Sequence, residues 1–361
     1  MPGRHQRTVK RRTLLRIAGA TVLIVAVTLI VGLVTGGGAG AGGDYEAGGP
    51  ATTAPLRAES SPTEPAPPTQ EATRQPRRHT ILIHATGDVS LDPSYIPALV
   101  ANGYGWAWSG LGGLFRRDDL TIINHECPST DIAAPIRKTF NFRCDPQALP
   151  AAKHAGVDVA NLANNHAYDQ GPEGLLDSIR NLRTAGIAPV GAGRTERDAE
   201  RPALFEIGGW KVAVVGFGEV LDPLDQTAGA HKPGTATGHS LPLKVRAIRA
   251  ADRVADAVIV VIHWGVELDT GPEAYQVREG HAMIDAGADV IVGHHAHRLQ
   301  PMSVYRGRPI FWGLGNFVWP AFSVDGSTTA VAEIRLTPDG RFHGRLIPAR
   351  IVSDGHPVLT P

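Results

Sequence analysis

The sequence predicts an α/β domain over residues 79–361. Apolar, β-branched runs of strand length alternate there with stretches of helical spacing, which is typical of α/β folds. Several of these runs end directly in polar residues that can bind a metal, and ligand sites of α/β sheets lie beyond the carboxyl ends of the strands. The span is long enough for one domain with a large core, since single domains of roughly 200–250 residues are routine.

The predicted elements follow one another in a regular order. Gly208-Gly209 lies between two apolar runs and predicts a hairpin. A proline in the first turn supports the first of the helices. The expected strands are residues 80–86, 120–124, 157–163, 204–207, 211–217, 257–262, 289–292, 300–305, 309–313, 328–336 and 342–351, and the expected helices are 172–185, 245–255 and 272–286.

Residues 1–78 are expected to lie outside this domain. Residues 1–16 form a basic tail, and the uncharged apolar run at 17–35 is long enough to span a bilayer as a signal anchor. The alternative is a cleaved signal peptide, for which Ala39-Gly40-Ala41 offers a small-residue site. Both alternatives place the domain outside the cell membrane, because the positive charge precedes the apolar run. Residues 36–78, rich in Pro, Gly, Ala and Thr, predict a disordered linker.

Charge and cysteine content limit the possible functions. The formal net charge is +0, so nothing in the composition indicates a nucleic-acid partner, and an anionic substrate would need a local positive centre such as a metal. The two cysteines, Cys127 and Cys144, are either joined in a disulfide, which an extracytoplasmic location permits, or are two buried thiols.

Five predicted strands end in polar residues that can bind a metal. Taken singly, each has an ordinary explanation: an aspartate can cap a turn, an Asn-His pair can hydrogen-bond loop backbone, and a histidine on an apolar strand can be a core residue. Their shared position at strand ends favours one metal site instead. The residues are Asp88, Glu126, Asn165 with His166, His263, and the cluster His294, His295 and His297.

This donor set contains oxygen and nitrogen but no thiolate, which suits Mn, Fe or Zn. It is larger than one tetrahedral ion needs, so two divalent ions are expected. Such a pair supplies a hydroxide nucleophile near neutral pH and neutralises an anionic substrate. A histidine outside the ligand set could then protonate a leaving oxygen, and His166 is the candidate for this catalytic role.

Several motifs together resemble the CapA family of bacterial poly-γ-glutamate capsule biosynthesis proteins. The resemblance covers residues 80 to about 335, and the motifs occur in the family's order. It implies the calcineurin-like metallophosphatase fold, in which helices flank two packed β-sheets. The motifs are Ala85-Thr86-Gly87-Asp88, Asn124-His125-Glu126-Cys127-Pro128, Asn164-Asn165-His166, His263-Trp264-Gly265, Gly293-His294-His295-Ala296-His297 and Leu314-Gly315-Asn316-Phe317.

The resemblance also implies roles for single residues. Asp88 would bind the first metal and Glu126 would bridge the two. The second metal would be bound by Asn165 and His263. His295 and His297 would also bind metal, and His166 would act as acid and anion binder. Glu267 is expected near the opening of the same site, and His294 is an extra histidine without an implied role.

Two departures from the metallophosphatase pattern bear on activity. Ser90 occupies the place where an Asp-x-His motif would put a histidine, and Glu126 replaces the usual bridging aspartate. His125, the neighbour of Glu126 on an extended segment, is expected to point to the other face and not to bind metal.

The predicted function is membrane-anchored assembly or export of poly-γ-glutamate, together with other capsule-synthesis membrane proteins. The metal cleft would act on the anionic polymer or hold it. One alternative is a metal-dependent phosphoesterase for a cell-envelope phosphoester. The other is a subunit of an export complex that binds the polymer without catalysis.

Overall fold

The computed structural model describes residues 77–220 and 226–361. The basic tail at 1–16, the apolar run at 17–35 and nearly all of the 36–78 segment lie outside the described residues. In the described part of the chain, no helix is both long and apolar enough to cross a bilayer.

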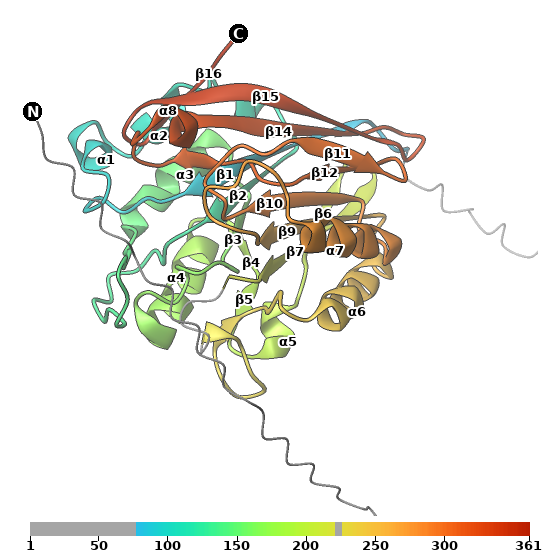
Figure 1. The fold of residues 1–361 in the computed structure, drawn as a ribbon, viewed down its shortest axis with the longest axis horizontal. Coiled ribbons are helices and arrows are strands. Elements are labelled where there is room, and N and C mark those ends of the chain that lie inside the picture. Colours follow the sequence, from blue (N-terminus) through green and yellow to red (C-terminus); the bar gives the residue numbers. More distant parts are fainter. Residues whose placement is uncertain (1–76, 221–225) are drawn as a thin grey trace, which may run out of the picture. The chain divides into compact units, whose positions relative to one another are not determined.

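Two large sheets make up the centre of the domain (Figure 1). The eight-stranded sheet has the order β16-β15-β14-β1-β2-β3-β4, with β13 also paired to β1. Its strands are β1 (Ile81–Val89), β2 (Leu120–His125), β3 (Val159–Asn161), β4 (Ala188–Val190), β13 (Asn316–Val318), β14 (Thr328–Leu336), β15 (Phe342–Ser353) and β16 (His356–Leu359).

The six-stranded sheet has the order β11-β12-β10-β9-β7-β6. The predicted hairpin is confirmed, because β6 and β7 pair antiparallel around Gly208-Gly209. The strands are β6 (Ala203–Ile207), β7 (Trp210–Gly218), β9 (Ala257–His263), β10 (Val290–His294), β11 (Met302–Tyr305) and β12 (Arg308–Phe311), while β5 (Ala192–Gly193) and β8 (Gly234–Thr235) form a separate small pair.

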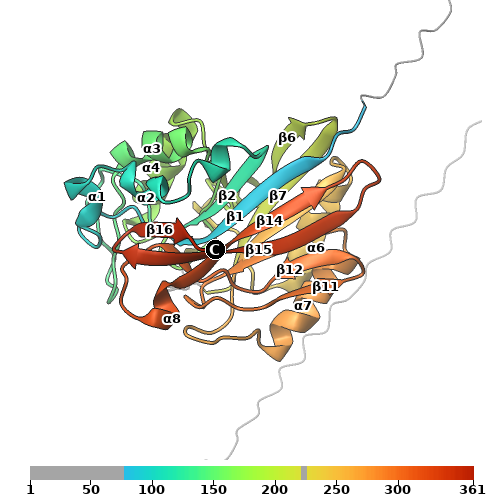
Figure 2. The same ribbon diagram turned by 90° about the horizontal axis from the view of Figure 1, so that it is seen from above.

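Helices flank the two sheets, while β14 and β15 have no helix over them in the view of Figure 2. On one side lie α3 (Leu149–Ala155) and α4 (Gly171–Thr184), and on the other lie α6 (Leu241–Asp252) and α7 (Ala274–Asp285). The short helices are α1 (Ala98–Ala101), α2 (Trp106–Ser109), α5 (Glu196–Ala199) and α8 (Val324–Ser327), with single 3₁₀ turns at Leu114–Arg116 and Pro146–Ala148.

Three apolar cores hold these layers together. The middle core joins the two sheets, with Ile83 of β1 and Val214 of β7 in one buried cluster. A second core packs the eight-stranded sheet against α3 and α4, and a third packs the six-stranded sheet against α6 and α7. The central strands β2, β9 and β10 are buried along their whole length, whereas β6, β11 and β15 are partly exposed. The predicted mixed α/β class with more than one sheet is confirmed.

Strand boundaries differ from the sequence prediction at two places that matter for the site. The first strand runs on to Val89, with a register shift between Ala85 and Asp88 where β13 joins β1. The third strand is shorter than predicted and ends at Asn161, because the chain turns there and Asn164 N donates to Leu162 O.

A candidate metal centre at the strand ends

The parallel strands of both sheets bring polar side chains to one level. In the eight-stranded sheet Asp88 pairs in register with Asn124 on one side and Asn316 on the other. In the six-stranded sheet His263 and His294 end β9 and β10 as register partners. Since the carboxyl ends of neighbouring parallel strands share an edge, these polar side chains lie at one edge of each sheet.

Three possible ligand atoms, one each from His263, Asn165 and His295, lie close together. His263 Nε2 lies 2.9 Å from Asn165 Oδ1 and 3.1 Å from His295 Nδ1. Two atoms bound to one ion at about 2.0–2.2 Å lie roughly 3 Å apart. This spacing therefore suits three ligands of a single ion.

Asp88 and His297 form a second group beside the first. His297 Nδ1 lies 3.2 Å from Asp88 Oδ2 and 2.8 Å from Asn316 Oδ1. Asn124 Nδ2 donates to Asp88 Oδ1 at 2.8 Å, which fixes the carboxylate. The sequence prediction did not assign roles to Asn124 or Asn316, although both belong to the motifs that carry the resemblance.

Glu126 lies between the two groups. One of its oxygens is 3.5 Å from His263 Nε2 and 3.9 Å from His297 Nε2. Within the described residues neither carboxylate oxygen has a hydrogen-bond partner, and the side chain is fully buried. A buried carboxylate without a partner is costly, and a bound cation is one of the few explanations for it.

The residues present thus fit divalent metal ions. Ligand atoms of Asp88, Glu126 and His263 lie within 4.8 Å of one another. The donors are carboxylates, imidazoles and an amide, which suit hard or borderline divalent ions. When bound, such ions supply positive charge for an anionic group and an activated water.

Burial and charge set the protonation of the carboxylates and of His297. Burial would raise the pKa of Asp88, but the hydrogen bond and charge of His297 outweigh it and hold that pKa below its usual value. Burial, and then the charge of Asp88, raises the pKa of Glu126 well above its usual value. Burial opposes charge on His297, yet Glu126 and Asp88 raise its pKa to about 9. His297 is therefore a cation when no metal is bound.

The other two histidines of the set are neutral. Burial, and then the charge of His297, lowers the pKa of His295 to about 4. Burial, and then the charge of His295, lowers the pKa of His263 well below its usual value. Neutral imidazole is the form that binds metals.

Two of the histidines occupy strained backbone. His295 has a φ of 91° and His297 a φ of 51°, a region that side-chain-bearing residues seldom adopt. Backbone strain of this kind collects at functional sites and persists only where the surroundings enforce it. It turns both imidazoles toward the group around Glu126.

His166 follows the ligand candidate Asn165 in the chain and is paired with Asp169. Its Nδ1 is 2.7 Å from Asp169 Oδ2, and its ring packs on Phe142 at 4.2 Å between centroids. Burial lowers the pKa of His166, against the opposing effect of Asp169. An imidazole held by a carboxylate is the arrangement of a general acid or base.

The other polar residues near the site engage other groups. His294 Nε2 lies 2.9 Å from Thr86 O, so this histidine contacts backbone and not the Glu126 group. His125 Nε2 lies 2.8 Å from Ser129 Oγ, away from the ligand candidates. The Oγ of the buried Ser90 lies 3.4 Å from Asp92 N, in the turn that follows β1.

Cys127 and Cys144 are joined in a disulfide, the first of the two alternatives. Cys144 Sγ also accepts a hydrogen bond from Leu91 N at 2.8 Å. The bond closes the loop that runs from Glu126 toward α3, next to the candidate centre.

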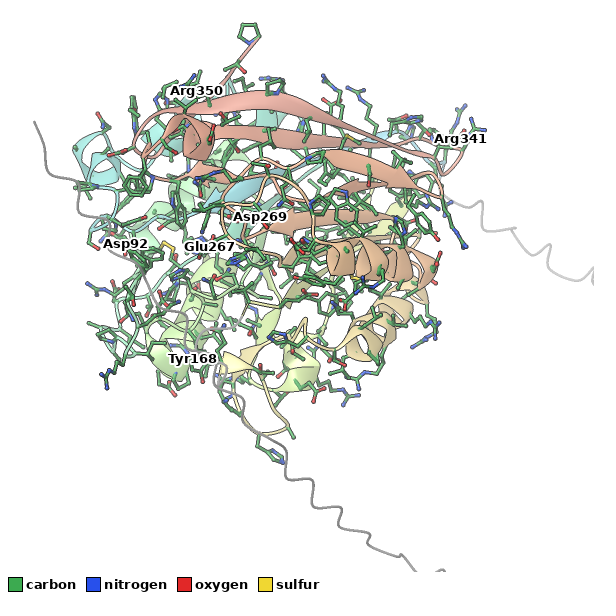
Figure 3. All side chains as sticks on the ribbon, in the orientation of Figure 1. Asp92, Tyr168, Glu267, Asp269, Arg341 and Arg350 are labelled. Carbon is green, nitrogen blue, oxygen red and sulfur yellow. A yellow bond between two sulfur atoms is a disulfide. The ribbon has the colours of Figure 1, made fainter. Side chains whose placement is uncertain are left out.

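A cavity of about 310 Å³ opens in front of the centre. His166, His297 and Asn316 line this cavity. Glu267, which the sequence analysis placed near the same site, also lines it and contributes a carboxylate. Figure 3 labels Glu267 on the loop that follows β9. The walls are aromatic and come from Tyr95, Phe140, Phe142, Trp319 and Phe322.

The fold and the site define an α/β domain of two packed sheets with a buried carboxylate–imidazole centre at the strand ends. The model of the bacterial capsule synthesis protein family, PGA_cap, matches residues 82–321. The chain belongs to this family.

Named relatives agree with this assignment. The chain is 34% identical over 227 residues to the capsule biosynthesis protein CapA of Bacillus anthracis, covering 61% of this chain and 54% of that protein. It is 33% identical over 230 residues to the PGA biosynthesis protein CapA of Bacillus subtilis, covering 63% and 60%. The chain thus spans less than two thirds of the length of these relatives.

Among solved structures, the Haemophilus influenzae NAD nucleotidase has a TM-score of 0.48 at 13% identity, with 76% of this chain and 51% of that chain covered.

Proposed function

We propose that the chain is a membrane-anchored component of poly-γ-glutamate capsule assembly or export, with its domain on the outer side of the membrane. Membership of the capsule synthesis family and the names of its Bacillus relatives support the process. The basic tail and apolar run at the N-terminus support the anchor. Other capsule-synthesis membrane proteins would be its partners.

In this proposal the domain binds an anionic chain through a pair of divalent ions. The observation that carries it is Glu126, whose buried carboxylate lacks a hydrogen-bond partner among the described residues and lies between two sets of donor atoms. Asp88 and His297 would hold one ion, Asn165, His263 and His295 the other, and Glu126 would bridge them. The proposed fold is the calcineurin-like metallophosphatase fold implied by the motifs.

The experiment has two arms. Metal content of the purified protein is measured after exposure to Mn²⁺, Fe²⁺ or Zn²⁺, and binding of poly-γ-glutamate is measured with and without EDTA. Two bound ions and polymer binding that EDTA abolishes are expected. A protein that takes up no divalent ion, or binds the polymer equally well in EDTA, would refute the proposal.

A second candidate function is hydrolysis, for which His166 is the specific observation. This imidazole is paired with Asp169, lines the cavity and lies next to Asn165. It could give a proton to the leaving oxygen of a cell-envelope phosphoester. Ser90 replaces the histidine of the metallophosphatase pattern, so we expect a slower rate than that histidine would support. Turnover of a generic phosphodiester by the metal-loaded protein separates this candidate from binding alone.

A further inference from the structure

A disulfide-closed loop contacts the Asn165–Asp169 segment of the candidate centre. We call residues 127–144, closed by Cys127 and Cys144, the strap. Its far end is fixed to the segment that carries His166: Phe142 N donates to Asp169 Oδ2 at 2.7 Å, and Asn141 Nδ2 donates to Asp169 O at 2.9 Å. The disulfide therefore joins the two ends of the strap, and hydrogen bonds close to its Cys144 end attach it to the segment that carries His166.

Lys138 is carried by the strap into the same segment. Its ammonium donates to Asn165 O at 2.5 Å and to Asp169 Oδ1 at 2.9 Å, and lies 3.2 Å from His166 Nδ1. The side chain is only 7% exposed. One buried cation thus contacts a candidate metal ligand, the candidate acid and the carboxylate that holds that acid.

The contacts define how His166 is presented. Asp169 Oδ2 and Lys138 both face Nδ1, so Nε2 is the nitrogen left to meet a ligand in the cavity. The Phe142 ring covers one face of the imidazole. The Asp169 carboxylate cannot turn away, because Lys138 engages one oxygen and Phe142 N the other.

We propose that Lys138 is a positioning residue, which holds the Asn165–Asp169 segment so that His166 presents Nε2 to the bound substrate. This role rests on the proposed hydrolytic function of the same site. Lys138 itself would touch neither the metals nor the substrate.

The Lys138 contacts differ from an ordinary surface ion pair in burial and in the number of bonding partners. Lys153 and Asp158 form such a pair at 2.7 Å, with side chains 40% and 27% exposed, and surface pairs of this kind contribute little. Lys138 is buried, bonds to a backbone carbonyl as well as to a carboxylate, and reaches the site from a loop closed by a disulfide. Loss of its ammonium would leave the buried Asp169 carboxylate without its cation. The Asn165–Asp169 segment would then lose the contacts to Asn165 O and Asp169 Oδ1 that fix its position.

The experiment compares three variants of the full protein. Lys138→Met removes the charge and keeps much of the side-chain length, Lys138→Arg keeps the charge, and Lys153→Met is the matched control. Each is checked for melting temperature and bound Mn²⁺, and then assayed on bis(p-nitrophenyl) phosphate.

Lys138→Met should lower kcat by about 10- to 100-fold, a loss in the range of an impaired general acid, while KM changes less than about 3-fold. Bound Mn²⁺ should stay at the wild-type level, Lys138→Arg should recover part of kcat, and Lys153→Met should behave as wild type. An unchanged kcat in Lys138→Met, or a loss that simply follows unfolding or loss of Mn²⁺, would overturn the proposal.

A second arm works without metal or turnover. Ring ¹⁵N signals of His166 in the metal-free protein should show one tautomer in the wild type and a mixture in Lys138→Met. Identical signals in the two proteins would overturn the positioning role. If the wild type binds Mn²⁺ but hydrolyses nothing, the hydrolytic function fails while these signals still decide the role of Lys138.

Discussion

Asn165 Oδ1 and His263 Nε2 lie 2.9 Å apart, although they come from different sheets of the domain. Asn165 follows β3 of the eight-stranded sheet, and His263 ends β9 of the six-stranded sheet. The candidate centre therefore forms only when the two sheets are packed together. An ion bound there would join both layers, which links metal affinity to folding.

The first prediction separates His263 from its register partner His294. His263→Ala should remove one bound ion per chain, because His263 lies at the meeting point of Asn165 and His295. His294→Gln should keep both ions, since His294 bonds to the Thr86 carbonyl instead. Metal analysis after gel filtration measures both, and equal metal loss in the two variants would contradict the assignment.

The second prediction concerns the charge of Glu126. Without metal, its buried carboxylate has no hydrogen-bond partner among the described residues. Such a group costs about 1–3 kcal/mol, a cost that the His297 imidazolium 3.9 Å away offsets only in part. Glu126→Gln should therefore raise the free energy of unfolding in EDTA by an amount of that order and abolish metal uptake. Urea denaturation with and without Mn²⁺ measures both effects.

Glu206→Gln is the control for this change, because the Glu206 side chain is 83% exposed. It should alter neither stability nor metal content. A Glu126→Gln protein that is less stable in EDTA than the wild type would show that the carboxylate has a stabilising partner.

The third prediction concerns the disulfide. Closing a loop of about 15 residues stabilises a fold by roughly 3 kcal/mol in the chain-entropy description. The double variant Cys127→Ser/Cys144→Ser should lose stability by about that amount. Its metal content at saturating Mn²⁺ should stay close to wild type, because neither sulfur belongs to the ligand candidates.

Denaturation in reducing and non-reducing buffer provides the comparison. The wild type with reductant should match the double variant without it. If reductant leaves wild-type stability unchanged, the disulfide does not form in the protein.

The fourth prediction gives a pH dependence distant from the centre. Burial raises the pKa of Asp289 to about 6, above the value of about 3.9 in an unfolded chain. The folded state therefore binds the proton more tightly, and stability falls as pH rises from about 4 to about 6. The contribution is on the order of 3 kcal/mol, and Asp289→Asn should remove it from the stability-versus-pH curve.

Asp256→Asn is a matched control for this slope. Asp256 also accepts from a strand N–H, that of Lys211, and from an arginine, Arg78, but at the surface. Its replacement should leave the slope between pH 4 and 6 as in the wild type. Parallel curves for the wild type and Asp289→Asn would contradict the prediction.

Much of the fold could be predicted because its strands are long and apolar. The strand 328–336 was predicted with the bounds that β14 has. By contrast β4 contains Pro189 and β13 has only three residues, so neither has a recognisable strand pattern. The helix α3 was missed although Pro150 near its start and Gly156 at its end, with a φ of 114°, are the usual signals.

The ligand candidates could be predicted because each directly follows an apolar strand. Asn124 and Asn316 were missed because their roles depend on strand register, which places both beside Asp88. Lys138 was missed for a different reason. It lies in an irregular loop, and only the return of that loop through Phe142 and Cys144 brings it to His166.

The turn that carries His295 and His297 also bears on how this sequence can change over evolutionary time. Glycine adopts positive φ freely, whereas other residues there cost about 1–3 kcal/mol. His295→Gly or His297→Gly would therefore relieve the backbone but remove an imidazole, so a change at either position exchanges a candidate ligand for folding stability.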